Sequence, residues 1–416
     1  MPLFFLPVLA QAFSVIAGDA SEVRARADGT GQFVDMTTTG HIALDLKLRR
    51  TTWTLFYAPS VTQLGLGSST SILFVTHTGG LTTHLRLSPR TSVTLSETGT
   101  YGQQNFRTLA VSAPAPTLDT SATAPGSGTG QPPVGTGTGQ TNGTAATAGT
   151  ANLAVPGSRT IRFGTVTVGA GVNHVLDRNW STGAFASYTP TKELDSYTPV
   201  TIPTSRTLLG NIWVMRTLGR RDQLVLTETG RYTVTEPNAE AIIATTNIAW
   251  NHRLSFHAGT SLFASESYVN STDLLGNHSK GVMPGAGATL TLNDSIRPAG
   301  ARLTTMMTVM FAPVVDYQFG GVNDMLSGVI GVNWTRKRLT FQFLGAASHS
   351  VGSYGQVNLL SMYGLTEAVI YQLDRRHWAI TAGMRQAWQQ FSTGQQLPPM
   401  WVAFVGLSYT TGAVPL

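Results

Sequence analysis

The feature of the sequence that most constrains its fold is a two-residue alternation of apolar with small or polar side chains. Runs of this kind cover residues 42–49, 165–176, 302–311 and 326–334. Successive side chains of a strand point to opposite faces, so each run has one apolar and one small or polar face. The runs last about nine to twelve residues, which suits a tilted strand crossing a bilayer. Strands of soluble proteins are shorter, at about five or six residues.

Short, mostly basic turns recur between these runs. Six of them lie at residues 49–52, 177–179, 219–223, 251–253, 335–338 and 374–377, and looser versions lie around Pro89 and Asp294. Successive turns are separated by about 32 to 43 residues, except in one interval that contains an insertion. This separation leaves room for a strand, a longer loop and a returning strand. Short turns at one end and long loops at the other are typical of outer-membrane barrels.

The turns also give a strand count. Eight turns join sixteen strands, and a first strand near residues 22–32 and a last one near 400–409 make eighteen. Sixteen is the alternative if the terminal segments do not pair. The predicted fold is therefore all-β: a transmembrane, antiparallel, up-and-down β-barrel.

Five of the eight tryptophans directly flank the turns. They are Trp53, Trp180, Trp250, Trp334 and Trp378. A ring with one apolar and one polar end favours the membrane interface, and barrels carry aromatic girdles there. We therefore predict that these five residues form an interfacial girdle.

The ends of the chain and one internal stretch depart from the strand pattern. Residues 1–20 lack Lys and Arg, and their apolar run ends at Ala10-Gln11-Ala12, which resembles a cleavage site. We predict a signal peptide over residues 1–20 and one barrel domain over residues 21–416. Residues 112–158 are dominated by Pro, Gly, Thr, Ala and Ser, with Asp119 as the only charge. This composition cannot form a core, and we predict a low-complexity extracellular loop insertion.

Composition argues against several function classes. Charged residues make up 12% of the chain, about half the usual share. The net charge of +6 is spread over the turns, without the basic stripe that nucleic-acid binding needs. The chain has no cysteine, which excludes thiolate metal sites, disulfides and a cysteine nucleophile. No phosphate-loop, serine-hydrolase or zinc-protease motif occurs, so we predict no enzyme activity, no cofactor and no metal site.

Charged residues within the alternating runs suggest a pore lining. The candidates are Asp45, Lys47, Arg86, Arg162, Arg302 and Arg385. An Arg or Lys facing lipid at mid-depth costs roughly 2–4 kcal/mol, whereas one facing a water-filled lumen stays hydrated. Five of the six are basic, so the hypothesis is a weak anion preference. The alternative is that they are wall contacts without marked selectivity.

Three glutamates conflict with the simple pattern. Glu97, Glu228 and Glu367 share the register of Leu95, Leu226 and Leu365. If the leucine face meets lipid, the carboxylates do too, unless bulges change the register or these strands turn that face inward. The sequence leaves both explanations open.

The chain resembles the porin-like outer-membrane β-barrels of Gram-negative bacteria in its alternating strands, its basic turns and the tryptophans beside them. It matches no single family of these proteins. The resemblance implies an outer-membrane location, contact with lipid and with the barrel assembly machinery, passage of small solutes, and in some members a homo-oligomer. Members often end in a strand whose last residue is aromatic. Leu407 and Tyr409 fit that role, but Thr410–Leu416 follow.

The function expected from this resemblance is a pore for passive diffusion of small hydrophilic solutes. The alternative is a non-transporting surface barrel that acts in adhesion or as a scaffold through long extracellular loops. A third interpretation, a soluble β-solenoid, lacks the repeat of about 20 to 30 residues that it requires.

Overall fold

The structure, a computed structural model, describes residues 10–28, 31–66, 71–105, 160–193, 204–273, 275–296, 300–315, 322–354, 359–374, 377–391, 399–411 and 414–415. Its strands are β1 (Ala10–Asp28), β2 (Gly31–Leu48), β3 (Thr51–Leu64), β4 (Ile72–Arg86), β5 (Thr91–Asn105), β6 (Thr160–Val175), β7 (Trp180–Glu193), β8 (Ser205–Thr217), β9 (Asp222–Thr235), β10 (Ala239–His252), β11 (Ala258–Thr272), β12 (His278–Ile296), β13 (Ala301–Val315), β14 (Val322–Arg336), β15 (Leu339–Tyr354), β16 (Leu359–Gln372), β17 (Trp378–Phe391), β18 (Met400–Thr410) and the short β19 (Val414–Pro415).

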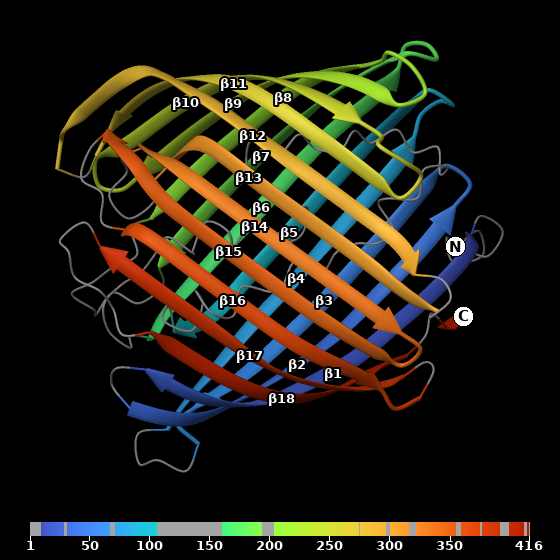
Figure 1. The fold of residues 1–416 in the computed structure, drawn as a ribbon, viewed down its shortest axis with the longest axis vertical. Coiled ribbons are helices and arrows are strands. Elements are labelled where there is room, and N and C mark those ends of the chain that lie inside the picture. The colour runs from blue at the N-terminus through green and yellow to red at the C-terminus, as the bar shows by residue number, and fades with distance from the viewer. Residues whose placement is uncertain are drawn as a thin grey trace, which may run out of the picture.

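The strands form one closed barrel. Each strand from β1 to β18 pairs antiparallel with its neighbours in sequence, and β1 also pairs with β18, from Gly18 opposite Thr410 to Ala27 opposite Trp401. The strands run side by side around the wall at a tilt, and the two chain ends lie at the same end of the barrel (Figure 1). The predicted antiparallel barrel of eighteen strands is confirmed.

The alternation in the sequence separates the two faces of this wall. Val166, Val168 and Val172 lie on the outward face with 40 to 50% of their surface exposed, and the intervening Thr165 and Gly169 are buried on the inward face. Residues directly opposite each other on paired strands share a face, so the register extends this assignment around the barrel. The outward face is the apolar one, as predicted.

The described loops are shorter than the sequence analysis predicted. The strands hold 11 to 19 residues, apart from β19, instead of about nine to twelve. Of the connections opposite the basic turns, residues 236–238 between β9 and β10 are described throughout, and this connection is short. Backbone pairing extends the strands beyond the apolar segment that the pattern marks. The predicted insertion at residues 112–158 lies outside the described residues.

The first strand also differs from the prediction. A strand was expected near residues 22–32, but β1 covers Ala10–Asp28 and pairs along its length with β2. The barrel wall thus begins before residue 21, within the segment assigned to the signal peptide. The small and apolar residues of that segment suit a strand as well as an export signal, and the signal peptide stays a prediction.

The described ranges contain no helix that is long and apolar enough to cross a membrane.

Aromatic side chains mark two levels of the outward face. The five tryptophans of the predicted girdle all lie outward beside the short turns, where Trp378 packs on Tyr409 with ring centroids 4.7 Å apart. A second set lies outward nearer the opposite end of the barrel: Tyr101, Tyr188, Tyr232, Tyr268 and Tyr363. The apolar wall between the two levels is the part expected to contact hydrocarbon.

The three glutamates of uncertain facing lie on the outward face. Glu97 is directly opposite Val168, Glu228 is opposite Ile212, and Glu367 is opposite Phe343, and all three are exposed. Each lies four residues along the strand from an outward tyrosine, which puts it between the two aromatic levels. Glu228 accepts a hydrogen bond from Thr246 on β10 (2.8 Å). No change of register removes these carboxylates from the apolar face.

We predict that Glu367→Leu stabilises the barrel in phospholipid vesicles by about 1–2 kcal/mol, because it removes a carboxylate from the hydrocarbon level. Denaturant titration of the folded fraction measures the change. Thr366→Val, on the inward face of the same strand, is the control and should give no such gain. A loss of stability in Glu367→Leu would mean that this carboxylate has a favourable contact in the membrane.

Candidate functional site

The inner wall is the candidate functional site, and five of the six predicted lining residues face it. Asp45 accepts a hydrogen bond from Thr54 (2.7 Å), and Arg302 donates one to Asn293 (3.0 Å). Lys47 is opposite Thr52 and Arg86 is opposite Ser92 on the same face. These four residues are spread over β2, β4 and β13, so the fold does not bring them together.

Arg162 was assigned to the wrong face. It lies four and six residues from Val166 and Val168 on β6, and these even spacings put all three side chains on the outward face. Arg162 is the third residue of its strand, at the end of the barrel opposite the short turns. A guanidinium can face outward there because that level lies beyond the apolar part of the wall.

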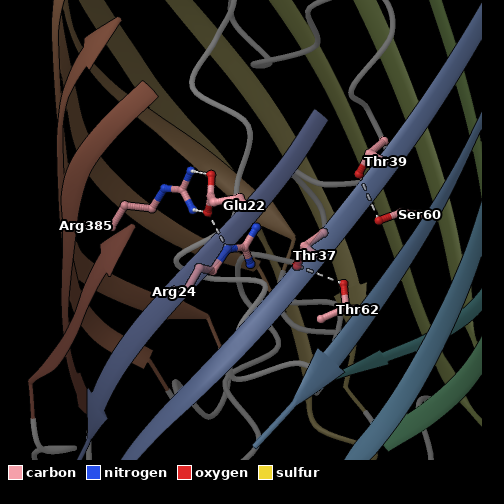
Figure 2. A network of polar contacts seen from close by, with 7 residues as sticks. All are labelled: Glu22, Arg24, Thr37, Thr39, Ser60, Thr62 and Arg385. Atoms are coloured by element: carbon pink, nitrogen blue, oxygen red, sulfur yellow. Dashed lines mark hydrogen bonds and ion pairs between the residues drawn. The ribbon is translucent and has the colours of Figure 1, made fainter. Parts of the chain in front are cut away.

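Arg385 belongs to a charged cluster that crosses the line where the barrel closes (Figure 2). Its guanidinium, on β17, donates to both carboxylate oxygens of Glu22 on β1, at 3.0 and 3.3 Å. Arg24 forms an ion pair with the same carboxylate. The Arg385 guanidinium also lies 4.1 Å from the ring centroid of Phe404 on β18, the strand between them. We call Glu22, Arg24, Arg385 and Phe404 the seam cluster.

The seam cluster joins residues that are far apart in the sequence. Glu22 and Arg385 are separated by 363 positions, and their side chains are less than a quarter exposed. A second contact fastens the same seam nearer the chain ends, where Thr411 accepts a hydrogen bond from the backbone of Ala17 (2.8 Å) and donates one to it (3.0 Å). The strand pair that closes the barrel is thus supported by side chains as well as by backbone hydrogen bonds.

Threonine and serine hydroxyls bond to one another across strands on the inward face. In Figure 2, Thr37 bonds to Thr62 (3.1 Å) and Thr39 to Ser60 (3.0 Å). The same pairing occurs at Thr78–Thr100, Thr165–Thr191, Thr167–Thr189, Thr207–Thr233, Thr245–Ser267, Thr289–Thr308 and Thr335–Thr340. Such pairs stabilise neighbouring strands and satisfy polar groups without adding charge.

Inward aromatic rings lie across glycines of neighbouring strands. A Cβ atom on Gly183 would stand 2.6 Å from the Trp213 ring, and one on Gly80 would stand 2.6 Å from the Phe56 ring. Phe185, Phe263 and Phe404 cover Gly169, Gly287 and Gly383 in the same way. Each glycine therefore leaves space for a ring to lie close to the wall, as in aromatic cover of strand glycines elsewhere.

The inner wall is less uniformly polar than the alternation predicted. Met215, Val225, Ala249, Phe263 and Met310 form one apolar row from β8 to β13, and Val225 and Ala249 are almost fully buried. A second apolar cluster includes Ile243, Val269 and Met283. Most of the inward charged residues lie on β1, β2, β4 and β17, and Arg231 on β9 and Arg302 on β13 lie apart from them.

Sequence analysis missed several inward charges. Glu22 and Arg24 were assigned to the first strand, but the face of the wall on which they lie was not predicted. Arg231 was not considered as a lining residue. Arg231 shares the register of Thr227, Thr229 and Thr233 on β9, and this parity could have identified it. Within the part of the chain that is described, no group of three or more His, Asp or Glu side chains could hold a metal ion.

No protein-family model and no curated protein sequence matches this chain. Solved structures do match its fold. OccK2 (OpdF) of Pseudomonas aeruginosa is 9% identical with a TM-score of 0.47, over 97% of this chain and 98% of that one. The FrpB iron transporter from Neisseria meningitidis is 7% identical with a TM-score of 0.50, over 92% of this chain. CdiB from Acinetobacter baumannii is 8% identical with a TM-score of 0.41, over 95% of this chain.

This chain spans about 62% of the length of FrpB and about 60% of that of CdiB. At such low identity the likeness concerns the fold alone. The comparisons therefore show a shared β-barrel fold, with no sequence family behind it.

We predict that Arg385→Met lowers the free energy of unfolding by about 2 kcal/mol, because it removes one partner of a largely buried ion pair. Urea titration in detergent, followed by the gel mobility of unheated samples, measures the loss. Arg86→Met changes an exposed inward arginine and should cost less than about 0.5 kcal/mol. Equal losses in both variants would contradict a special role for the seam cluster.

Proposed function

We propose that this protein is a channel in the outer membrane of a Gram-negative bacterium, through which small hydrophilic solutes diffuse passively with a weak preference for anions. The observation that carries the proposal is the balance of charge on the inner wall. Among the side chains that the structure describes, the inward basic residues are Arg24, Lys47, Arg86, Arg231, Arg302 and Arg385, and the inward acidic ones are Glu22, Asp35 and Asp45. A lumen with excess positive charge attracts anions.

The form of the wall supports a passive route. A barrel of about sixteen to eighteen strands leaves an aqueous lumen unless a segment plugs it. Hydroxyl pairs line much of the inward face, so a passing solute meets polar groups that are already satisfied. Within the described strands, the charged groups of the seam cluster form ion pairs with one another along the wall, which does not favour tight capture of a solute.

The second candidate is a non-transporting surface barrel that binds other proteins through its loops. The apolar clusters on the inner wall favour it, since they reduce the wetted part of the lumen. The connection at residues 236–238, which is described throughout, offers little surface for adhesion, so this candidate depends on loops outside the described residues.

We further propose that an export signal is removed after Ala12. Cleavage there would leave most of β1, from Phe13 to Asp28, to pair with β2 and β18. The remaining expected partners are outer-membrane lipid, the barrel assembly machinery and, in an oligomer, further copies of this chain.

The test is conductance in planar lipid bilayers. We expect stable single-channel steps, and a reversal potential across a KCl gradient that indicates a modest excess of chloride over potassium permeability. Arg86→Ala together with Arg302→Ala should reduce the permeability ratio about twofold, because both remove inward positive charge.

Arg162→Ala is the matched control, since it removes an outward arginine and should leave the ratio unchanged. Clear preference for potassium in the wild-type protein would contradict the anion preference. A folded barrel that produces no steps would favour the non-transporting alternative.

A further inference from the structure

Five of the short turns form one continuous edge at their end of the barrel. They lie at residues 49–50, 87–90, 176–179, 218–221 and 253–257. Backbone hydrogen bonds of 2.7 to 2.8 Å join each turn, or the strand end beside it, to the next one. They run from Arg86 to Arg50, from Val175 to Arg90, from Thr217 to Asn179 and from Arg253 to Arg221. Because neighbouring turns are two strands apart, about 10 Å separates one from the next.

This edge carries eight arginines. We call them the basic rim: Arg49, Arg50, Arg90, Arg178, Arg216, Arg220, Arg221 and Arg253. Arg253 is half-buried and the other seven are exposed. Arg90 and Arg253 each donate a hydrogen bond to a backbone carbonyl group, of Leu176 and Ser255 respectively, which does not neutralise their charge.

The acidic residues of the same turns have structural partners. Asp177 accepts hydrogen bonds from the backbone of Asn179 (2.6 Å) and of Trp180 (2.9 Å). Asp222, which follows the turn at residues 218–221, bonds to the indole of Trp250 (3.0 Å) and to the ring of His252 (2.7 Å). These two carboxylates fix the turns and the tryptophans beside them. They are outnumbered by the eight arginines, so the edge has a large excess of positive charge.

Apolar side chains lie beside the basic rim with about half of their surface exposed. They are Leu87, Leu176, Leu218 and Leu254, at 49 to 54%. Phe256 is 83% exposed, and its ring centroid is 4.7 Å from the Arg253 guanidinium. Arg216 lies 5.1 Å from the ring centroid of Trp180, which belongs to the predicted girdle. Positive charges thus stand next to apolar groups at the level where the tryptophans indicate the membrane interface.

This arrangement restricts the chemistry of a partner. A guanidinium binds phosphate oxygens through two parallel N–H groups, and one that stacks on an aromatic ring keeps those groups in its own plane. Basic side chains at a membrane surface attract anionic lipids. A zwitterionic headgroup carries its own cation and gains less from the same charges. An acidic protein would match the charge, but the exposed leucines and tryptophans lie where acyl chains reach.

We propose that the basic rim binds the phosphate groups of anionic phospholipids in the membrane leaflet at the short-turn end of the barrel. The acyl chains of these lipids lie against the tryptophans and the exposed leucines. The inference rests on the membrane location within the proposed function, but not on conduction. It also goes beyond that function, because none of the eight arginines belongs to the inward set on which the anion preference depends.

The test is quenching of tryptophan fluorescence by brominated lipids, with the full-length barrel in mixed vesicles of phosphatidylcholine and phosphatidylglycerol. Five of the eight tryptophans lie beside the short turns, so the fluorescence reports mainly on that leaflet. We compare vesicles in which only one of the two lipids is brominated. At low ionic strength, phosphatidylglycerol should be preferred next to the barrel at least about threefold. In about 0.5 M KCl the preference should largely disappear, because salt screens the charges.

The variant for this test combines Arg178→Gln, Arg220→Gln and Arg221→Gln. It removes three exposed charges from two neighbouring turns and should reduce the lipid preference at least about twofold. Arg49→Gln with Arg50→Gln, in another turn, should act in the same direction and keeps the test valid if the triple variant fails to fold. Heat-dependent gel mobility verifies the folding of each variant.

The matched control removes three exposed positive charges at the opposite end of the barrel. It combines Arg162→Gln, Lys192→Gln and Lys280→Gln. The preference reported by the tryptophans should change less than about 1.3-fold, because the other leaflet surrounds these residues. Equal losses in the control and in the rim variant would overturn the proposal, as would equal quenching by the two lipids at low ionic strength.

Conductance of the same protein in planar bilayers separates this inference from the channel function. A conducting barrel without a lipid preference would overturn the role of the basic rim and leave the channel function standing. A barrel that prefers phosphatidylglycerol but does not conduct would support the role of the rim and contradict the channel function.

Discussion

In hydrocarbon, every backbone N–H and C=O group needs a partner within the protein, because no water is there to supply one. This constraint determines the rest of the structure. A sheet with two free edges would expose unpaired groups along both of them, so the first and last strands must meet. The pairing of β1 with β18 removes those edges. It also requires segments from opposite ends of a chain of 416 residues to find each other. The seam cluster and the bonds between Thr411 and Ala17 add side-chain stabilisation at that one join.

Once the wall is closed, its two faces contact different surroundings and therefore need different side chains. The outward face needs apolar bulk, which valine, leucine and aromatic residues supply at every second position. The inward face carries polar groups at close spacing, and many of their hydroxyls bond to each other across strands. Rings that lie over glycines add apolar area without extending far from the wall. This division accounts for a composition rich in glycine and poor in charge.

The exceptions to this division are informative because they carry an energetic cost. Outward carboxylates such as Glu228 and Glu367 lie between the aromatic levels, where lipid solvates them poorly. On the inward face, the amide oxygens of Asn211 and Asn247 and the hydroxyls of Ser181, Thr235 and Ser279 have no hydrogen-bond partner. The packing of the wall explains neither set.

The sequence alone determined the architecture, because it depends on local rules. Alternation gives a strand two unlike faces, the basic turns separate the strands, and counting those turns leads to eighteen. The structure places Asp45, Lys47, Arg86, Arg302 and Arg385 on the inward face, and their role as a pore lining stays a prediction. Applied to every residue, the alternation also puts Arg162 on the outward face and Arg231 on the inward face. The sequence therefore contained the information that the interpretation missed for these two residues.

Only the tertiary structure decided what depends on register between strands. The meeting of Glu22 with Arg385, the alignment of Asn211, Thr229 and Thr245 in one row, and the start of β1 at Ala10 follow from which residues lie opposite each other. Local pattern does not contain this information, because a strand keeps the same alternation when it slides by two residues along its neighbour. Closure of the whole barrel selects one register, and with it the side chains that come together on the inner wall.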